Sequence, residues 1–399
     1  MIDETHDPGL RSWVESANRA GCEFPIQNLP LGVFRLKGEK QARCGVAIGD
    51  FILDASGWLS SETLNGYMAL PASDRRQLRL EWSRILRAGS PERELLPQTG
   101  AEMLLPARIG DYSDFYASIH HATNVGRMFR PENPLFPNYK HVPIAYHGRS
   151  SSVFASGTAI KRPSGQRGQG DFGPTRELDY EVEIGAFVGP GNAPGEPIPI
   201  SEARQHIVGV CLVNDWSARD IQRWEYQPLG PFLSKSFATS ISPWVITTEA
   251  LEPFREEAAT HETDPLPYLQ ESQAGAFNIM VEAWLLGRGM RQPVRLSRSS
   301  FREMYWTLPQ MLTHQTSNGC PARPGDLIAS GTISGPEKEN RGCLLELTEK
   351  GKEPVRLPDG EERVFLEDGD QIVLRGHCKR DAFVSIGLGC CAGTIVAAG

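Results

Sequence analysis

Residues 178–188, Leu-Asp-Tyr-Glu-Val-Glu-Ile-Gly-Ala-Phe-Val, are the stretch that says most about the fold and about a possible site. Apolar side chains recur at every second position, which is the period of a β-strand with one face in the core. Glu181 and Glu183 therefore share the other face, with side chains rooted about 7 Å apart. At about 5 Å and an effective dielectric of about 20, two carboxylates repel by about 3 kcal/mol, and a bound cation removes that cost. The alternative at this point is a solvated strand face with scattered acids.

The stretches on either side favour a rolled or sandwiched β architecture. Residues 207–213 form a continuous apolar run, which is typical of a strand buried on both faces. Residues 323–328 and 367–374 repeat one pattern, a turn containing Gly-Asp followed by a strand. Neither a dinucleotide-binding nor a P-loop glycine pattern follows an expected strand. We therefore expect a mainly β protein without βαβ units.

The first part of the chain is expected to be a separate, structural unit. Short strands are expected at 34–36 and 44–54, followed by one polar helix over 60–87. Prolines then mark loops up to the Leu-Leu-Pro sequence that ends at residue 106. The length of the chain allows two domains, which we place at 1–105 and 106–399. The first of them has no cluster of catalytic residue types.

Composition excludes several classes of protein. The chain has 399 residues, of which 40% are hydrophobic and 23% are charged, as in ordinary globular proteins. No apolar run approaches the ~18 residues of a membrane span, and no secretory signal pattern opens the sequence. The net charge of −8 argues against a nucleic-acid or anionic-membrane surface. Eight cysteines without CxxC spacing indicate a reduced, cytoplasmic protein.

A further carboxylate, Asp215, lies at the end of the apolar strand that starts at residue 207. Ser217 is expected to cap a short helix from residue 218 to about 226. On that helix Arg219, Gln222 and Tyr226 are spaced to line one face beside Asp215. An ordinary amphipathic helix is the alternative.

Two more segments add reactive residue types. Residues 111–130 supply Asp114 as an oxygen ligand, a histidine of the doublet His120-His121 as a base, with His121 as the candidate, and Arg130 as a carboxylate clamp. The residues alone leave open which histidine of the doublet matters. Lys235 lies in an apolar loop constrained by Gly and Pro. A lysine in such a loop either extends its ammonium group to water or forms an ion pair with a negative charge. The acids Asp114, Glu181, Glu183 and Asp215 make an all-oxygen set, which selects Mg²⁺, Ca²⁺ or Mn²⁺ and disfavours zinc. With Arg219 and Lys235 nearby, these residue types indicate metal-assisted chemistry on a carbonyl compound.

These motifs resemble the fumarylacetoacetate hydrolase family in its full-length, two-domain type. The resemblance is carried by residues 111–130, 146–149, 178–183, 214–226, 228–239, 329–335 and 344–347. It implies a small N-terminal SH3-like β-barrel and a larger C-terminal mixed β-sandwich roll, assembled as a homodimer. It also implies hydrolysis of the carbon–carbon bond of 4-fumarylacetoacetate to fumarate and acetoacetate, the last step of tyrosine and phenylalanine catabolism.

The resemblance also assigns roles to single residues. It implies Ca²⁺ or Mg²⁺ held by the four acids, with a second Mg²⁺-type site near Asp215 that involves Lys235 and Thr239. His121 is then the general base, Glu346 orients it, and the oxyanion is received by Arg219, Gln222 and Lys235. The implied substrate contacts are Tyr116, Arg130, Tyr146, Gln222, Tyr226 and Thr332. One departure from the family pattern is Ala238, which stands where a glycine is usual beside the second metal site.

Two other hypotheses keep the acids but change the function. Smaller relatives with the same Glu-x-Glu ligands look like decarboxylases, hydratases or acylpyruvate hydrolases that act on 2-oxo or enol acids. The N-terminal unit and the set Tyr116, Arg130 and Tyr226 favour the longer hydrolase. A purely structural calcium site leaves His121 and Lys235 without a role.

Overall fold

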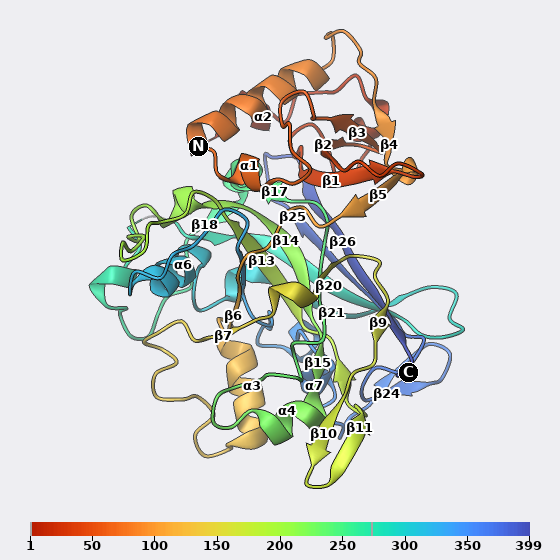
Figure 1. The fold of residues 1–399 in the computed structure, drawn as a ribbon, viewed down its shortest axis with the longest axis vertical. Coiled ribbons are helices and arrows are strands. Elements are labelled where there is room, and N and C mark those ends of the chain that lie inside the picture. The colour runs from red at the N-terminus through yellow and green to blue at the C-terminus, as the bar shows by residue number, and fades with distance from the viewer. Residues whose placement is uncertain (1, 273) are drawn as a thin grey trace.

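The N-terminal unit is a small antiparallel β-sheet with helices beside it, at the top of Figure 1. The computed structural model describes residues 2–272 and 274–399. The sheet has the order β4-β3-β2-β1-β5, and its strands are β1 (Leu31–Leu36), β2 (Arg43–Ile48), β3 (Phe51–Asp54), β4 (Leu96–Pro97) and β5 (Ala101–Leu104). The strands expected in this unit are confirmed.

The long helix expected in this unit is two helices, α1 (Asn65–Met68) and α2 (Ala72–Leu86). The prediction of one continuous helix was wrong because Pro71, with ψ at 150°, interrupts the helical backbone and forms the N-cap of α2. Trp82 and Leu86 of α2 are buried in the same core cluster as the sheet, as their helical spacing predicts.

The C-terminal unit is built around a mixed eight-stranded sheet. Its order is β7-β6-β22-β13-β14-β16-β8, with β17 paired to β14. The strands are β6 (Tyr112–Phe115), β7 (Ala145–His147), β8 (Val153–Ala155), β13 (Val182–Val188), β14 (Ile207–Asp215), β16 (Thr239–Ile241), β17 (Ile246–Thr247) and β22 (Leu327–Ala329). The pairs β6–β22 and β8–β16 are parallel and the others are antiparallel. The expected buried strand over 207–213 is therefore confirmed as part of β14, at the middle of this sheet.

A second sheet packs against the first and completes the β-sandwich. Its order is β21-β20-β25-β26-β9, formed by β9 (Ile160–Lys161), β20 (Ile279–Leu286), β21 (Val294–Ser300), β25 (Gln371–Cys378) and β26 (Ile386–Val396). Strands β13 and β14 contact β20, β25 and β26, and one apolar cluster joins the two sheets. The mainly β fold, with a small N-terminal unit and a larger C-terminal one, is confirmed. The boundary between residues 105 and 106 stays a prediction.

Short helices and two-stranded pairs surround the two sheets of the C-terminal unit, and several of them lie at its lower end in Figure 1. The helices of this unit are α3 (Ile119–Phe129), α4 (Arg219–Glu225), α5 (Thr248–Leu251), α6 (Leu308–Thr316) and α7 (Leu344–Leu347). The strand pairs are β10 (Ser164–Gly168) with β11 (Asp171–Pro174), β12 (Leu178–Asp179) with β15 (Ser217–Ala218), β18 (Arg255–Glu256) with β19 (Ala276–Phe277), and β23 (Val355–Arg356) with β24 (Glu362–Arg363).

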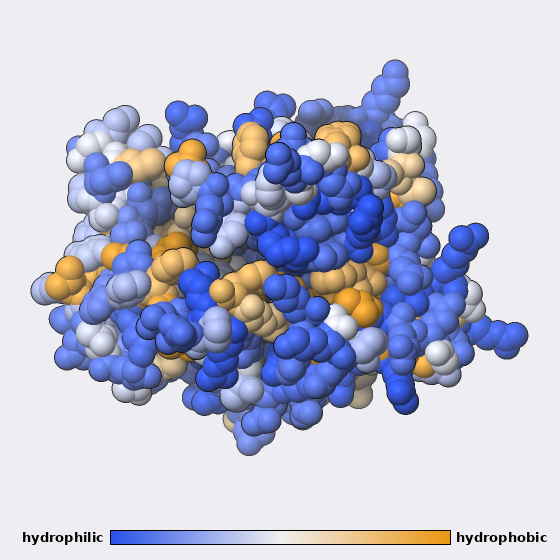
Figure 2. All heavy atoms as spheres, turned by 90° about the horizontal axis from the view of Figure 1, so that it is seen from below, coloured by the Kyte–Doolittle hydropathy of each residue, from blue (hydrophilic) through white to orange (hydrophobic). Residues whose placement is uncertain are grey.

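The lower end of the molecule carries several exposed apolar side chains. Figure 2 views this end from below and shows apolar groups scattered among polar ones. Around α4, β11 and the loop after α4, the exposed apolar side chains are Phe172, Trp224, Leu229, Phe232 and Leu233. Among the described residues, no helix is long and apolar enough to cross a membrane.

Candidate metal centre and active site

Three carboxylates from three strands of the large sheet meet at one point. Asp114 is the third residue of β6, Glu183 is the second residue of β13, and Asp215 is the last residue of β14. One carboxylate oxygen from each lies within 4.8 Å of the others. Strands β13 and β14 are direct neighbours, and only β22 lies between β13 and β6. The register of these strands places Asp114, Glu183 and Asp215 close to one level of the sheet. Their exposed fractions are 2%, 0% and 0%, which excludes the solvated strand face.

The three acids fit a hard divalent cation. Neither oxygen of Glu183 accepts a hydrogen bond from any described residue, although both oxygens are fully buried. Burial, followed by the negative charge of the neighbouring acids, raises the pKa of Asp114 and of Glu183 well above their usual ranges. Buried carboxylates without donors are costly, and a cation with oxygen ligands supplies the missing partner. The set offers no sulfur or nitrogen atom, as Mg²⁺, Ca²⁺ and Mn²⁺ prefer.

A ring of donors fixes the orientation of Asp215. The hydroxyl of Tyr146 donates to Oδ2 over 2.6 Å, and that of Thr239 donates to Oδ1 over 3.0 Å. Lys235 Nζ lies 2.7 Å from Oδ2. Because Tyr146, Thr239 and Lys235 come from three different segments, the carboxylate is held in place before any ligand binds.

Asp114 is held by a backbone donor that needs a glycine. The N–H of Gly331 donates to Asp114 Oδ1 over 3.1 Å. Gly331 has φ at +75°, and a Cβ at this residue would lie 2.0 Å from the carbonyl oxygen of Phe115. Only glycine satisfies both conditions, which explains its place in the Gly-Thr-Ile-Ser-Gly string.

Glu181, the fourth expected ligand, lies outside this group of three. It falls between β12 and β13, with one oxygen 2.8 Å from Arg219 Nη1 and the other paired with Lys235 Nζ. Burial raises the pKa of Glu181, but the charges of Lys235 and Arg219 outweigh it and lower the pKa. Glu181 is therefore ionised and neutralises the two cations. Lys235 Nζ contacts both Glu181 and Asp215, which places Glu181 next to the three acids.

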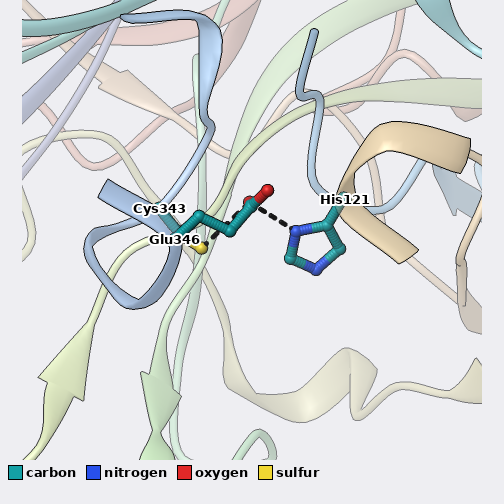
Figure 3. Close-up of side chains that lie close together, drawn as sticks. All are labelled: His121, Cys343 and Glu346. Atoms are coloured by element: carbon teal, nitrogen blue, oxygen red, sulfur yellow. Dashed lines mark hydrogen bonds and ion pairs between the residues drawn. The ribbon is translucent and has the colours of Figure 1, made fainter. Parts of the chain in front are cut away.

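Beside the acids, His121 and Glu346 form a buried pair. His121 Nδ1 lies 2.6 Å from Glu346 Oε2, and Figure 3 shows the second ring nitrogen directed away from the carboxylate. Asn124 donates to Glu346 Oε1 over 2.9 Å, and Ser334 donates to Oε2 over 2.8 Å. Burial raises the pKa of Glu346, but the charge of His121 and these hydrogen bonds lower it to about 2. A charged carboxylate on Nδ1 orients the ring and leaves the other nitrogen free to accept a proton.

Hydrogen bonds at the starts of α3 and α7 position His121 and Glu346. Ser118 caps α3, and its hydroxyl accepts the N–H of His121, so the imidazole lies in the first turn of the helix. Glu346 lies in α7, whose first two N–H groups, those of Leu344 and Leu345, donate to the buried carboxylate of Asp179 over 2.8 and 3.0 Å. Asp179 also accepts from Arg219 Nε over 2.9 Å. Asp179 thus connects the segment that carries Glu346 to the cation beside Glu181.

The expected Ser217 cap is wrong. Ser217 and Ala218 form β15, paired with β12, and the hydroxyl of Ser217 donates to the carbonyl of Asp215. The helix starts at Arg219 without a side-chain cap. Arg219 and Gln222 do lie together on α4, because Arg219 Nη1 donates to Gln222 Oε1 over 3.2 Å.

The expected substrate contacts lie around the two clusters at different depths. The ring of Tyr116 packs edge-on against His121, with centroids 5.4 Å apart, and Thr332 is buried directly after Gly331. Arg130 lies over the ring of Phe136 at 4.1 Å, at the end of α3. Tyr226 ends α4, and its hydroxyl accepts from Gln227 rather than from a residue of the site.

Sequence reasoning missed four residues of the site: the buried Asp179, Ser334 and Cys343 and the half-buried Asn124. Asn124 is three residues after His121 in α3, so helical spacing alone indicates a shared face. Cys343 precedes Glu346 by three residues, and its thiol donates to Glu346 Oε2 over 3.3 Å. Asp179 and Ser334 contact residues that are distant in the sequence, so no local pattern predicts these contacts.

Known proteins provide an independent comparison. Residues 27–106 match the family described as "Fumarylacetoacetase N-terminal", and residues 112–396 match "Fumarylacetoacetate (FAA) hydrolase C-terminal". The chain is 49% identical to the fumarylacetoacetase of Bos taurus over 94% of its own length and 97% of that protein. It is 48% identical to that of Homo sapiens with the same coverage, and 45% identical to that of Oryza sativa subsp. japonica over the whole of both chains.

Solved structures show the same fold at low identity. A fumarylacetoacetate hydrolase from Exiguobacterium antarcticum superposes with a TM-score of 0.56 at 17% identity, over 92% of this chain and 99% of that one. A maleylpyruvate hydrolase from Sphingobium gives a TM-score of 0.52 at 16% identity, over 92% of this chain and all of that one. Taken with the near full-length sequence matches and the two buried clusters, these findings show that the chain belongs to the fumarylacetoacetase family, with both the N-terminal and the C-terminal unit of that family.

Proposed function

We propose that this protein is a metal-dependent fumarylacetoacetase, which hydrolyses the carbon–carbon bond of 4-fumarylacetoacetate to fumarate and acetoacetate in tyrosine and phenylalanine catabolism. The observation that carries the proposal is that one unit of the fold holds both the buried His121–Glu346 pair and the cluster of three buried acids. A base next to an oxygen-only cation site is what hydrolysis of a diketo acid requires. The relatives at 48–49% identity carry this name over nearly their whole length.

The proposed metal ligands are Asp114, Glu183 and Asp215, with Glu181 as a fourth. We propose Ca²⁺ or Mg²⁺ as the ion, because all of these ligands are carboxylates. A divalent ion held there supplies positive charge beside the carbonyl oxygens of the diketone, which stabilises the negative charge of the departing acetoacetate. Lys235 and Thr239 lie on the other side of Asp215, where we place the second, Mg²⁺-type site.

His121 is the proposed general base. Its free nitrogen takes a proton from water, and the resulting hydroxide adds to the carbonyl carbon next to the bond that breaks. The electron pair of that bond goes to the acetoacetate carbon, which then takes a proton, so one water is consumed for each pair of products. Glu346 keeps Nδ1 occupied and stabilises the imidazolium that forms.

Cations and hydroxyls around the clusters complete the proposed site. Arg219, Gln222 and Lys235 are the proposed donors to the oxyanion, and all three come from α4 or the loop after it. The proposed substrate contacts are Tyr116, Arg130, Tyr146, Tyr226 and Thr332. Of these, Tyr116 and Thr332 lie next to His121 and Gly331, while Tyr146 contacts Asp215 directly.

The substrate is tested by following the ultraviolet absorbance of the diketo acid. We expect fast loss of absorbance with fumarylacetoacetate and much slower loss with simple acylpyruvates. Faster turnover of an acylpyruvate, with release of pyruvate, would contradict the proposed substrate.

Lys235→Ala is expected to lower kcat by about 10²–10³, the usual cost of losing one oxyanion donor. The ammonium group is buried between Glu181 and Asp215, and burial lowers its pKa less than these two acids raise it, so it stays charged. The exposed Lys352→Ala serves as the control and is expected to leave kcat unchanged. Normal turnover by Lys235→Ala, measured on protein with full metal content, would remove the assignment.

Chelation with EDTA is expected to abolish activity, and Mg²⁺ or Ca²⁺ is expected to restore it. Because burial and the neighbouring acids raise the pKa of Asp114 and of Glu183, protons compete with the ion for these carboxylates. Metal affinity, measured by isothermal titration calorimetry, is therefore expected to rise with pH. Restoration by Zn²⁺ alone would contradict the all-oxygen site.

We also propose that the protein is a cytoplasmic homodimer. All eight cysteines are free thiols, as a reducing compartment favours. The exposed apolar side chains around α4 are of the kind that a second subunit covers. Sedimentation analysis is expected to give twice the monomer mass, and a monomer at micromolar concentration would contradict the dimer.

A further inference from the structure

The pair of His121 and Glu346 has a third member with different chemistry. Cys343 lies at the start of α7, and its Sγ, one oxygen of Glu346 and one ring nitrogen of His121 all lie within 4.8 Å of one another (Figure 3). All three residues are buried, with exposed fractions of 4% for His121 and 0% for Cys343 and Glu346. The three atoms are a nitrogen, a sulfur and an oxygen, whereas the neighbouring acids offer oxygen only.

We propose that His121, Cys343 and Glu346 form a second metal site, selective for a thiophilic ion such as Zn²⁺ or Cd²⁺, and that occupation of this site switches the enzyme off. Three protein ligands of these types with water as the fourth make an ordinary zinc coordination sphere. Thiolate and imidazole favour zinc, while Mg²⁺ and Ca²⁺ prefer the carboxylates of the other site. The two sites therefore separate ions by ligand softness.

The surroundings of Glu346 support this site. Asn124 donates to one carboxylate oxygen and Ser334 to the other, so the carboxylate is fixed in orientation, as the ligands of metal sites commonly are. The carboxylate of Glu346 is ionised and accepts no hydrogen bond from a lysine or arginine of the described chain, because Arg341 reaches only the backbone carbonyl of Glu346. The charge of the carboxylate therefore remains available to an ion. The ion would enter by the route that the substrate takes to His121, the one member of the cluster with some exposed surface.

Inhibition follows from which ring nitrogen is used. The ion takes Nδ1 of His121, and the thiol proton of Cys343 goes to solvent. The proton that Nδ1 carried moves by way of solvent to Nε2, so the ring stays neutral. With Nδ1 bound to the ion, the remaining proton of the neutral ring lies on Nε2, so this nitrogen cannot accept a proton from water. The acids Asp114, Glu183 and Asp215 are not involved, so added Mg²⁺ cannot relieve the inhibition.

The test uses the Mg²⁺-saturated enzyme, titrated with Zn²⁺ for activity and with Cd²⁺ for absorbance. We expect loss of activity that a large excess of Mg²⁺ does not reverse, and a near-ultraviolet thiolate-to-cadmium band with one cadmium bound. In Cys343→Ser, which keeps a donor to Glu346, the band should disappear. The zinc concentration for half-inhibition, relative to the variant's own uninhibited rate, should rise by more than about tenfold. Cys320→Ser, at an exposed cysteine, is the matched control and should behave like the wild type.

Three outcomes would overturn the proposal: the absence of a cadmium–thiolate band, an unchanged zinc sensitivity in Cys343→Ser, or relief of inhibition by Mg²⁺. Only the inhibitory consequence rests on the proposed function. A chain that binds cadmium through Cys343 but does not hydrolyse the diketo acid would keep the metal site and refute the hydrolase, so the two failures can be told apart.

Discussion

His121→Ala is expected to lower kcat by about 10²–10⁴, the usual contribution of a positioned general base. His121 is buried, and its charged partner Glu346 holds Nδ1 while Figure 3 shows the other ring nitrogen directed away from that carboxylate. Metal content should be unchanged, because Asp114, Glu183 and Asp215 do not contact His121. Steady-state kinetics, together with metal analysis of the same purified variant, measures both quantities.

The preceding residue supplies the matched control. His120 is half-buried, and its ring lies 3.9 Å from Glu303, away from Glu346. His120→Ala should retain most of the activity. Loss of bound metal in His121→Ala would make His121 a ligand instead of a base, and inactivation by His120→Ala would mean that the wrong member of the doublet is assigned.

Glu183→Gln is expected to abolish both metal binding and turnover. The substitution keeps the shape of the side chain but removes the charge from the acid that lies at the centre of the sheet. Because neither oxygen of Glu183 accepts a hydrogen bond from a described residue, the amide breaks no contact of the metal-free protein. The melting temperature without metal should therefore stay the same or rise, while the increase in melting temperature on adding Mg²⁺ or Ca²⁺ should vanish.

An exposed glutamate serves as the comparison. Glu202→Gln should keep the metal-induced stabilisation and the activity. Full metal content in Glu183→Gln would show that the ion lies elsewhere. A large loss of stability without metal would show that Glu183 acts in packing.

Much of the fold is visible in the sequence because burial leaves a period-two or continuous apolar pattern. Of the run over 178–188, residues 182–188 form the central strand β13 beside the run that starts at residue 207, while residues 178–179 pair separately with β15. The N-terminal helix was predicted too long, since the apolar pattern continues across Pro71 although the backbone does not. The cap at Ser217 failed for a similar reason, because strand pairing with β12 overrides the local preference of serine for a helix start.

The site was less visible because it depends on which distant charges meet. The Glu-x-Glu pattern places two acids on one strand face, but only the structure shows Glu183 with the metal-site acids and Glu181 with Lys235 and Arg219. Asp179 lies in a strand, β12, as the pattern predicts, and its carboxylate in addition accepts two backbone N–H groups of α7. Such contacts join residues far apart in the sequence, so no local spacing predicts them.

A crystal grown with Mn²⁺ and measured for anomalous scattering tests the central claim most directly, since Mn²⁺ shares the oxygen preference of Mg²⁺ and Ca²⁺. The account predicts a strong peak among the carboxylates of Asp114, Glu183 and Asp215, with no manganese between His121 and Glu346. A peak on the imidazole of His121, or no peak near the three acids, would contradict it.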